Sequence, residues 1–364
     1  MKITVTKEVL LKGLQRIKNV VSNRTTPILS NVLIEATEKG VRLTTTDLEL
    51  GIRCDIEAKV DKTGATTLPA KRLVDVVSGL PVADITIEVD SKNMATLRCA
   101  TAQYKIFGLS KDEFPPFPAF AEAKTYNLQQ GVLLDGLRKT SYAISPDETR
   151  YVLNGIYFSF ADNKFTLAAT DGRRLALFDA DLEFSKKLEK NFIVPTKAVR
   201  ELLHIVGEEG EIEIAASENL ALFRMAGVEL ATKLVEGAYP DYKRVIPGEA
   251  KERVTIDREQ FLSVAKRVSL FSPEKSGSLR LTLDNGEMSI FASTPEAGEA
   301  EESIAVKYSG RKMVIAFNPE FLMDPLKNLS EGEVYLDLID EMSPGAIKID
   351  SPFLYVIMPM RVSL

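Results

Sequence analysis

Two adjacent arginines are the first side chains in the sequence whose types and spacing could do chemistry. Arg173 and Arg174 follow Asp171 and Gly172 in the segment Thr170–Ala176, which separates two alternating apolar runs. An aspartate followed by a glycine favours a tight turn between strands. Guanidinium groups bind carboxylate and phosphate oxygens through paired hydrogen bonds. The segment therefore predicts a turn between strands with two adjacent arginines, which could bind an anion.

The sequence offers this pair no catalytic partners. His204 is the single histidine, which excludes a metal site built on two histidines and disfavours a catalytic triad. No G-x-x-x-x-G-K-[ST] phosphate loop occurs, and no pattern places Asp171 opposite Asp241 as paired carboxylates. We expect His204 to be a partly buried helix residue, and we expect no catalysis, no metal and no cofactor. A phosphate hydrolase with the arginines as an anion clamp stays one alternative, without a nucleophile or base.

Cysteine use and the pattern of apolar residues predict the compartment. Cys54 continues the alternation of Leu50 and Ile52, so we expect a buried apolar residue and not a redox or metal-binding thiol. Cys99 lies 45 positions further on, and no C-x-x-C pair occurs. Met1 leads into an alternating strand, and no apolar run approaches the roughly 18 residues that cross a membrane. We therefore expect a cytoplasmic protein without a membrane partner.

The elements that would position these residues occur three times along the chain. The pattern around Ile3 returns around Tyr126 and Val254, with offsets of 123 and 128 residues. The three stretches are MKITVTKEVLLKGLQRI, TYNLQQGVLLDGLRKT and RVTIDREQFLSVAKRV. A repeat of this length is a whole domain and not a solenoid unit. We predict three domains, at 1–122, 123–250 and 251–364.

Each copy has the pattern of antiparallel strands with two helices, an α+β fold. A strand leads into the first helix, and a later strand ends in proline or Asn-Pro and opens the second. Pro325 lies inside the last helical segment, where its missing N–H costs roughly 3 kcal/mol. The sequence leaves open whether that helix kinks or starts late. The predicted helical segments are 7–24, 69–80, 131–150, 195–206, 257–267 and 319–329.

Charge is distributed unevenly between helices and strands. The net charge of −6 by itself argues against nucleic acid as a partner. The six helical segments together carry +6, so the rest of the chain carries −12. One explanation is that lysine and arginine are good helix formers on solvated faces. The other is a basic surface on an acidic body, which would focus an electric field on a polyanion.

Three further motifs accompany Thr170–Ala176, namely Thr26–Asn31, Tyr239–Tyr242 and Tyr355–Arg361. With the threefold plan they cover the whole chain, and together they resemble the bacterial DNA polymerase III β subunits, the sliding clamps. The resemblance implies a non-catalytic processivity subunit with three clamp domains, each with antiparallel sheets outside and two helices lining a central hole. It also implies a head-to-tail homodimeric ring that encircles duplex DNA and slides without reading its sequence.

The resemblance and the basic helices together suggest the DNA contacts. Arg24 and Lys197 match family positions that contact DNA. Loosely arranged basic side chains would touch phosphates and bind in a salt-dependent way. The other candidates are Lys12, Arg16, Arg138, Arg150, Tyr151, Arg200 and Arg267.

The resemblance also implies a pocket for short linear peptides from the replicative polymerase, the clamp loader and repair proteins. Apolar walls would hold Leu and Phe anchors, and deformable methionines would accept several sequences. Arg173 stands where some relatives have histidine, and Val362–Leu364 would extend the usual tail over the pocket mouth. The matching positions are Leu153, Thr170, Gly172, Arg173, Arg174, Leu175, Pro240, Arg244, Val245, Val356, Met358, Pro359, Met360 and Arg361.

Opposite ends of the chain would form the interface of the ring. The acidic run 296–302 would face Lys71 and Arg72 of the partner, or it is a solvated loop. A second alternative for the whole chain is a repeat-built scaffold that binds acidic proteins and encircles no DNA. The positions that match the family's interface are Tyr104, Ile106, Leu270 and Phe271.

Overall fold

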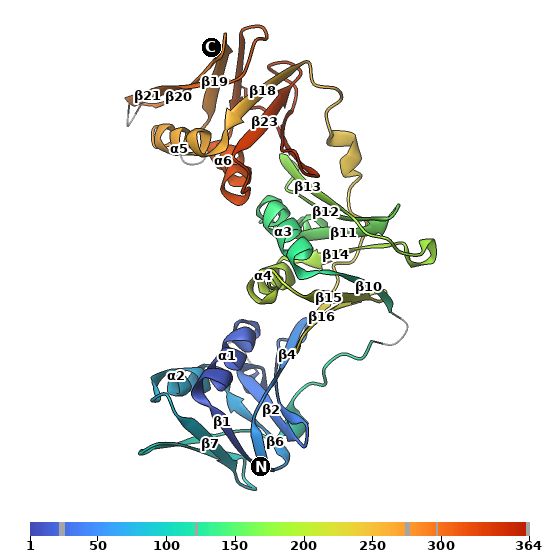
Figure 1. The fold of residues 1–364 in the computed structure, drawn as a ribbon, viewed down its shortest axis with the longest axis vertical. Coiled ribbons are helices and arrows are strands. Elements are labelled where there is room, and N and C mark those ends of the chain that lie inside the picture. The colour runs from blue at the N-terminus through green and yellow to red at the C-terminus, as the bar shows by residue number, and fades with distance from the viewer. Residues whose placement is uncertain (22–25, 121–122, 274–276, 296–297, 362–364) are drawn as a thin grey trace. The chain divides into compact units, whose positions relative to one another are not determined.

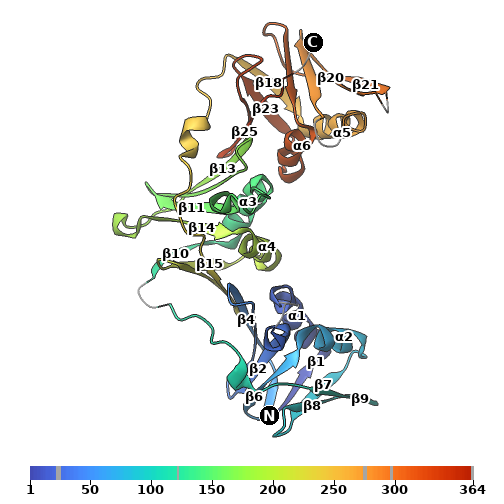
Figure 2. The same cartoon turned by 180° about the vertical axis from the view of Figure 1, so that it is seen from behind.

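The structure is a computed structural model that describes residues 1–21, 26–120, 123–273, 277–295 and 298–361. The chain forms two compact units (Figure 1). Unit 1 comprises Met1–Leu134 with Lys197–Leu234, and unit 2 comprises Asp135–Thr196 with Val235–Leu364. Figure 2 shows the same elements from behind. Among the described residues, no helix is both long and apolar enough to span a bilayer.

Unit 1 contains two antiparallel sheets, with the strand orders β5-β1-β7-β8-β9 and β10-β15-β16-β17-β4-β3-β2-β6. Helix α4 begins one residue before the unit does. The described elements are β1 (Lys2–Thr6), α1 (Lys7–Ile17), η1 (Lys18–Val20), η2 (Pro27–Ser30), β2 (Asn31–Thr37), β3 (Gly40–Thr46), β4 (Leu50–Ile56), β5 (Lys59–Lys62), β6 (Gly64–Pro69), α2 (Ala70–Gly79), β7 (Asp84–Val89), β8 (Met94–Cys99), β9 (Ala102–Phe107), η3 (Lys111–Glu113), β10 (Lys124–Gln129), α4 (Thr196–Ile205), β15 (Glu211–Ala216), β16 (Leu220–Met225) and β17 (Val228–Lys233).

Helix α1 illustrates how the sequence builds unit 1. The hydroxyl of Thr6 caps the helix by accepting a hydrogen bond from the Val9 amide at 3.4 Å. Leu10 and Leu14 stand at helical spacing and are fully buried where α1 packs on α2, β3 and β4 (Figure 1). Burying each leucine contributes about 1.5–3 kcal/mol. The same face that carries the apolar stripe therefore fixes how the helix lies on the sheet.

Unit 2 also contains two antiparallel sheets, with the strand orders β14-β11-β12-β13-β25-β24-β23-β18 and β21-β20-β19-β22. The first turn of α3 belongs to unit 1. The described elements are α3 (Gln130–Thr140), η4 (Ser141–Ala143), η5 (Tyr151–Leu153), β11 (Gly155–Ala161), β12 (Lys164–Thr170), β13 (Arg174–Asp181), η6 (Lys186–Leu188), β14 (Lys190–Pro195), η7 (Tyr242–Val245), β18 (Glu252–Asp257), α5 (Arg258–Ser269), β19 (Leu279–Asp284), β20 (Glu287–Thr294), β21 (Gly298–Ala305), β22 (Met313–Phe317), α6 (Pro319–Asn328), β23 (Glu333–Leu338), β24 (Gly345–Lys348) and β25 (Phe353–Ile357).

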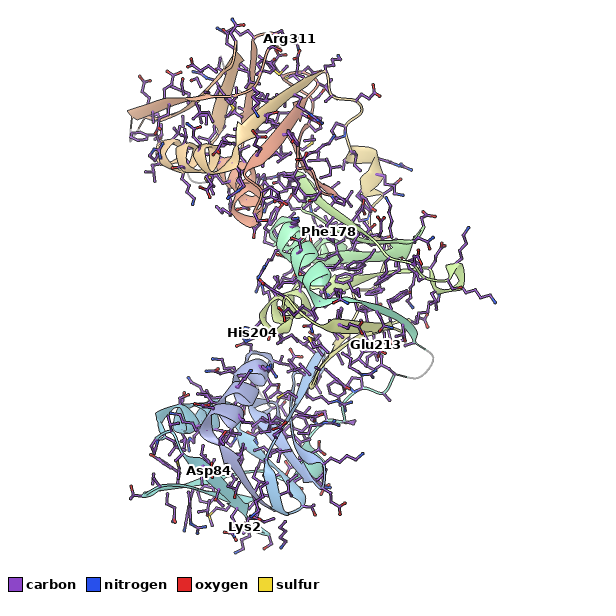
Figure 3. All side chains as sticks on the ribbon, viewed as in Figure 1. Lys2, Asp84, Phe178, His204, Glu213 and Arg311 are labelled. Carbon is purple, nitrogen blue, oxygen red and sulfur yellow. The ribbon has the colours of Figure 1, made fainter. Side chains whose placement is uncertain are left out.

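Glycines shape unit 2 at a turn and at a close helix contact. Asn285 and Gly286 join β19 to β20 with φ of 43° and 83°, the positive φ values that a tight two-residue hairpin turn requires. In α3, a Cβ on Gly136 would come within 2.7 Å of the ring of Phe178, a buried residue of β13 (Figure 3). Glycine at position 136 thus lets the helix approach the sheet closely.

The aligned positions of the three copies are equivalent in the structure. Ile3, Tyr126 and Val254 all lie in the first strand of their copy and are at most 3% exposed. This confirms the alignment that the sequence predicted. The first-helix positions Leu10, Leu133 and Phe261 are buried in the same way.

Strand pairing crosses the borders between the copies. In unit 1, Leu230 of β17 pairs with Ile52 of β4. In unit 2, Ala176 of β13 pairs with Tyr355 of β25. Each eight-stranded sheet therefore combines strands of two copies, and the division between the compact units runs through the middle copy.

Two predicted helices were too long. The segments 7–24 and 131–150 form α1 and α3, which end at Ile17 and Thr140 and continue into short 3-10 turns. The hydroxyl of Thr45 donates to the Ile17 carbonyl at 2.8 Å, so a side chain satisfies a carbonyl at the helix end. Such tertiary donors leave no trace in the local sequence pattern.

Helix α6 settles part of the question about Pro325. The helix begins at Pro319, capped by the Asn318 side chain that accepts from the Phe321 amide at 3.1 Å. Pro325 lies inside the helix and is buried. Of the two alternatives that the sequence left open, the late start is therefore excluded.

Candidate functional site

The predicted arginine turn is present between β12 and β13. One carboxylate oxygen of Asp171 accepts the amides of Arg173 at 2.9 Å and Arg174 at 3.1 Å. The hydroxyl of Thr170 accepts the Gly172 amide at 3.1 Å, and Gly172 has a φ of +87°. The local sequence thus builds the turn by itself, through side chains that take the place of backbone acceptors.

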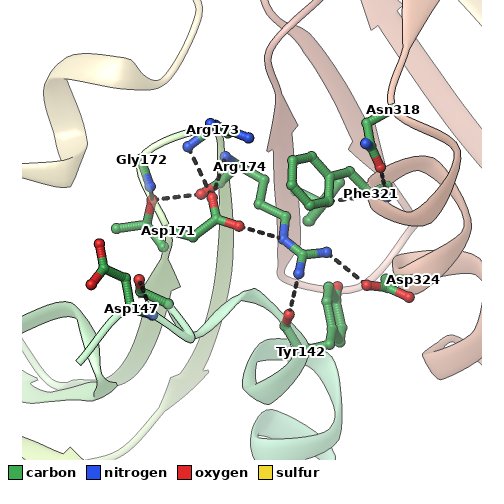
Figure 4. Close-up of polar contacts among 12 residues, drawn as sticks. Tyr142, Asp147, Asp171, Gly172, Arg173, Arg174, Asn318, Phe321 and Asp324 are labelled. Carbon is green, nitrogen blue, oxygen red and sulfur yellow. Dashed lines mark hydrogen bonds and ion pairs between the residues drawn. The ribbon is translucent and has the colours of Figure 1, made fainter. Parts of the chain in front are cut away.

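Arg174 is a buried structural residue and does not form an anion-binding pair with Arg173. Its side chain is 8% exposed and donates to Asp171 at 3.0 Å, to Asp324 at 2.7 Å and to the Tyr142 carbonyl at 2.6 Å (Figure 4). The guanidinium group also lies 4.3 Å from the centroid of the Phe321 ring. Each of the three guanidinium nitrogens donates a hydrogen bond within unit 2, which disfavours the alternative of an anion clamp shared with Arg173.

Arg173 differs from its neighbour. It is exposed, and no hydrogen bond or ion pair of its side chain is recorded among the residues that the structure describes. Its backbone carbonyl accepts the Met358 amide at 3.0 Å. The guanidinium of Arg173 is therefore the one of the two that a ligand could reach, and the backbone of Arg173 lies beside Met358.

An apolar floor lies next to this turn. Leu175 and Val356, on neighbouring strands β13 and β25, are buried together with Ala168. The aromatic rings of Tyr239 and Tyr242 pack against this cluster, and the Tyr157 and Tyr239 rings stack at 5.0 Å. Burial raises the pKa of Tyr242 to about 12. The connection before β18 is thus held on the sheet by its tyrosines.

The C-terminal residues run from this floor to β22. The Met358 amide bonds to Arg173, and the Met360 amide donates to the Ala316 carbonyl at 2.7 Å. Met358 and Val245 are both exposed, large apolar side chains. Both apolar side chains are therefore accessible to a ligand, and Met358 is bonded through its amide to the arginine turn.

We use the name docking surface for the residues that the sequence analysis selected for peptide binding, several of which are buried, and all of them belong to unit 2. Pro240, Arg244 and Arg361 are exposed, whereas Pro359 and Met360 are half-buried. Arg244 forms an ion pair with Asp241 at 2.9 Å. The residues of the docking surface are Leu153, Thr170, Gly172, Arg173, Arg174, Leu175, Pro240, Arg244, Val245, Val356, Met358, Pro359, Met360 and Arg361.

Sequence reasoning missed the residues that support the docking surface from inside. Tyr142, Phe321 and Asp324 hold Arg174, and Tyr355 lies beside Tyr142 with ring centroids 5.8 Å apart. The helix start at Asn318 places Phe321 and Asp324 one turn apart on α6. Nothing in the sequence, however, indicates that this turn meets residue 174.

The basic residues predicted in unit 1 lie on helices. Lys12 and Arg200 are exposed on α1 and α4, and Arg16 is half-buried on α1. Lys197 of α4 forms an ion pair with Asp47. Arg24 lies outside the described residues.

The basic residues predicted in unit 2 are less uniform. Arg138 on α3, Arg150 and Tyr151 are exposed. Arg267 of α5 makes two hydrogen bonds to Glu302, at 2.9 and 2.6 Å, which lower the pKa of that carboxyl. Within its own unit, Glu302 therefore already has a cationic partner.

The predicted interface residues lie near sheet edges and helix ends. On the edge strand β9, Tyr104 is exposed, Ile106 is buried, and Phe107, which the sequence analysis did not select, is 77% exposed. Leu270, directly after α5, is 76% exposed, and Phe271 is half-buried. Lys71 and Arg72 are exposed on α2.

The structure also tests the predictions made for Cys54 and His204. Cys54 is buried as predicted, and burial raises the pKa of its thiol to about 11. His204 lies on α4 but is exposed, so the expectation of a partly buried histidine is wrong. The buried stripe of α4 runs through Val199 and Leu202, and position 204 falls outside it. No cluster of metal-ligating side chains occurs among the described residues.

Three domain families match the chain in order. Residues 1–118 match "DNA polymerase III beta subunit, N-terminal domain", residues 127–241 match its central domain and residues 243–361 its C-terminal domain. The beta sliding clamp of Chlamydia muridarum is 33% identical over 363 residues, which cover 100% of this chain and 99% of that protein.

Solved structures agree. A sliding clamp (DNA polymerase III subunit beta) from Bartonella birtlesii bound to griselimycin has a TM-score of 0.94, 36% identity and full coverage of both chains. The sliding clamp of Pseudomonas aeruginosa bound to griselimycin has a TM-score of 0.95 and 32% identity, also with full coverage of both chains.

Proposed function

The chain belongs to the DNA polymerase III beta subunit family, and from this membership we propose how its surfaces divide the work of a beta sliding clamp. It is a DNA sliding clamp of DNA replication, a processivity subunit that is not itself an enzyme. Relatives that match the whole chain are clamps, which disfavours a scaffold that encircles no DNA. The proposed clamp domains are 1–122, 123–250 and 251–364.

Two chains join head to tail into a ring that surrounds duplex DNA, with the helices inside and the sheets outside. Support comes from the basic side chains that the described helices expose, among them Lys12, Arg200 and Arg138. Contacts of this kind are made with phosphates, read no base and weaken steeply with salt. Arg24 and Lys197 are proposed as the main contacts by their match to the family's positions, with Arg16, Arg150, Tyr151 and Arg267 as additional ones.

The proposed interface joins two sheet edges. Strand β9 ends one sheet of unit 1 and β21 ends one sheet of unit 2, so each has unpaired backbone groups. Phe107 and Tyr104 would add apolar contact from β9, and Leu270 with Phe271 would add it from the other chain. Lys71 and Arg72 would meet the acidic run 296–302, of which 296 and 297 lie outside the described residues. These charges would orient the two chains more than they hold them together.

The docking surface receives short linear peptides from the replicative polymerase, the clamp loader and repair proteins. The observations that carry this proposal are the exposed apolar side chains of Met358 and Val245 and the exposed side chain of Arg173, whose backbone carbonyl accepts the Met358 amide. Methionine adapts to several partner side chains, which suits a surface shared by many proteins. These partners act on cytoplasmic DNA, so the cytoplasm is the proposed location.

A competition experiment tests the docking surface. We propose that a labelled ten-residue peptide with Leu and Phe anchors binds here, and that griselimycin, which two relatives bind, displaces it. Fluorescence anisotropy measures both steps. A peptide that binds equally well to a Val245→Asp, Met358→Asp variant would rule this surface out as the docking site.

Light scattering tests the ring separately. The chain has a mass of 40.2 kDa, and the proposal expects twice that value in solution. A stable monomer at micromolar concentration would contradict the ring. A Phe107→Asp, Leu270→Asp variant is the matched control. Both side chains are exposed and belong to the proposed interface, so this variant should have the mass of a single chain.

A further inference from the structure

Pro325 leaves one carbonyl of α6 without its helical donor. In an α-helix the carbonyl of Phe321 accepts the N–H of the residue four positions later. That residue is Pro325, which has no N–H. A buried carbonyl without a donor would cost stability, so another group has to take its place.

The hydroxyl of Tyr355 supplies that donor. It lies 2.7 Å from the Phe321 carbonyl oxygen, and Tyr355 is fully buried on β25. Burial raises the pKa of Tyr355, although nearby Arg174 acts in the opposite direction, so the hydroxyl keeps the proton that it donates. The neighbouring Tyr142 hydroxyl has no hydrogen-bond partner in the described structure and therefore does not compete for this carbonyl.

The bond ties the docking surface to the helix. Tyr355 lies three residues before Met358, on the strand that pairs with β13 next to the arginine turn. On the other side of the bond, Phe321 carries the ring under Arg174. One hydrogen bond thus connects the strand that leads into the C-terminal methionines with the helix that holds the turn.

We propose that Pro325 and Tyr355 act as a pair. The proline leaves the Phe321 carbonyl without a helical donor, and the Tyr355 hydroxyl donates to that carbonyl and so positions the C-terminal strand. Tyr355 is then a positioning residue for the docking surface, although its own side chain is buried and reaches no peptide. The functional part of this inference rests on the proposed docking of peptides. Its structural part does not.

Three variants test whether the Tyr355 hydroxyl positions the C-terminal strand or only provides a hydrogen bond to the buried Phe321 carbonyl. Tyr355→Phe removes only the hydroxyl. Pro325→Ala adds a helical N–H that can donate to the Phe321 carbonyl. The double variant has this helical donor but no bond between helix and strand. Urea unfolding, amide hydrogen exchange at Met358 and Met360, and anisotropy with the labelled Leu/Phe peptide are measured on each full chain.

We expect Tyr355→Phe to be less stable, to exchange the two methionine amides faster and to bind the peptide about tenfold more weakly. Pro325→Ala alone keeps the amide exchange and peptide affinity of the wild type and is at least as stable, because a carbonyl oxygen can accept from both donors and the helix gains an N–H. The double variant regains the unfolding midpoint but keeps fast exchange and weak binding.

Two results would overturn the inference. In one, the double variant regains amide protection and affinity together with stability, so the hydroxyl only satisfied a carbonyl. In the other, Tyr355→Phe changes neither exchange nor affinity. A wild type that binds no peptide would refute the docking proposal alone, since amide exchange still decides whether Tyr355 positions the strand.

Discussion

Lys197 of α4 forms an ion pair with Asp47, which lies between β3 and β4 in the same unit. The carboxylate is fixed in place, because its other oxygen accepts the amides of Glu49 at 3.0 Å and Leu50 at 2.7 Å. Asp47 is 9% exposed, whereas about half of the lysine side chain is accessible. A phosphate that binds Lys197 must therefore compete with an internal carboxylate.

Asp47→Asn should strengthen the binding of linear duplex DNA. The amide keeps an oxygen for the two backbone donors and removes the competing charge. Because a partly exposed ion pair contributes little free energy, we expect the affinity for duplex DNA to rise by up to about fivefold. Anisotropy with a labelled duplex at several salt concentrations measures it. Lys197→Ala is the matched variant and should lower the slope of log affinity against log salt by about 1. An unchanged affinity of Asp47→Asn with an unchanged slope of Lys197→Ala would exclude Lys197 from the DNA contacts.

Arg174→Ala should destabilise the chain strongly. The substitution leaves the largely buried Asp171 without its cation and leaves Asp324 with Lys327 alone, at 3.0 Å. Removing one partner of a buried ion pair typically costs about 3–5 kcal/mol. Urea unfolding measures the loss. Arg173→Ala changes an exposed neighbour and should stay within about 0.5 kcal/mol of the wild type. Equal effects of the two substitutions would mean that the network around Arg174 contributes nothing specific.

Removal of residues 358–364 should abolish peptide binding and leave the dimer intact. The deletion takes away Met358 and the hydrogen bonds of both methionine amides, whereas the proposed interface lies elsewhere. Anisotropy and light scattering measure the two properties. A deletion of Val362–Leu364 alone is the control and should retain binding. A chain that loses both peptide binding and dimerisation would show that the C-terminal segment is structural.

Glu201→Gln should change how stability depends on pH. Burial raises the pKa of Glu201 above its ordinary value of 4.5, while His204, Asn19 and Lys197 lower it. A raised pKa in the folded state means that the folded chain holds the proton more tightly than the unfolded chain does. The contribution to stability is therefore largest below pH 4.5 and is lost as the pH rises through the folded-state pKa.

Unfolding in urea at about pH 4 and about pH 7 tests this sign. The glutamine variant should gain stability relative to the wild type as the pH rises. Glu208→Gln is a suitable control, because Glu208 is exposed. A difference between Glu201→Gln and wild type that does not vary with pH would contradict the sign.

The sequence predicted the repeated elements well, because their determinants are local. Periodic apolar residues such as Leu10 and Leu14, and helix starts such as Asn318–Pro319, need no tertiary information. The turn at Asp171 is predictable for the same reason. Helix ends were less accurate, because α1 ends where the Thr45 hydroxyl takes a carbonyl from another element.

The candidate sites were predictable in outline and not in their internal contacts. The sequence does not distinguish Arg173 from Arg174. Only the structure shows that the guanidinium of Arg174 is hydrogen-bonded to Asp324 and to the Tyr142 carbonyl. Pro325 was a local conflict in the sequence. The structure resolves this conflict through the hydrogen bond from the Tyr355 hydroxyl to the Phe321 carbonyl. These two residues are 34 positions apart, so the local sequence could not predict their contact.

Retention on circular DNA tests the central claim most directly. The protein is assembled on a nicked circular plasmid, unbound protein is removed in moderate salt, and half of the sample is linearised with a restriction enzyme. A clamp that encircles the duplex stays on the circle and leaves the linear DNA by sliding off its ends, because its phosphate contacts alone are weak at that salt concentration. Equal release from circular and linear DNA would contradict topological tethering.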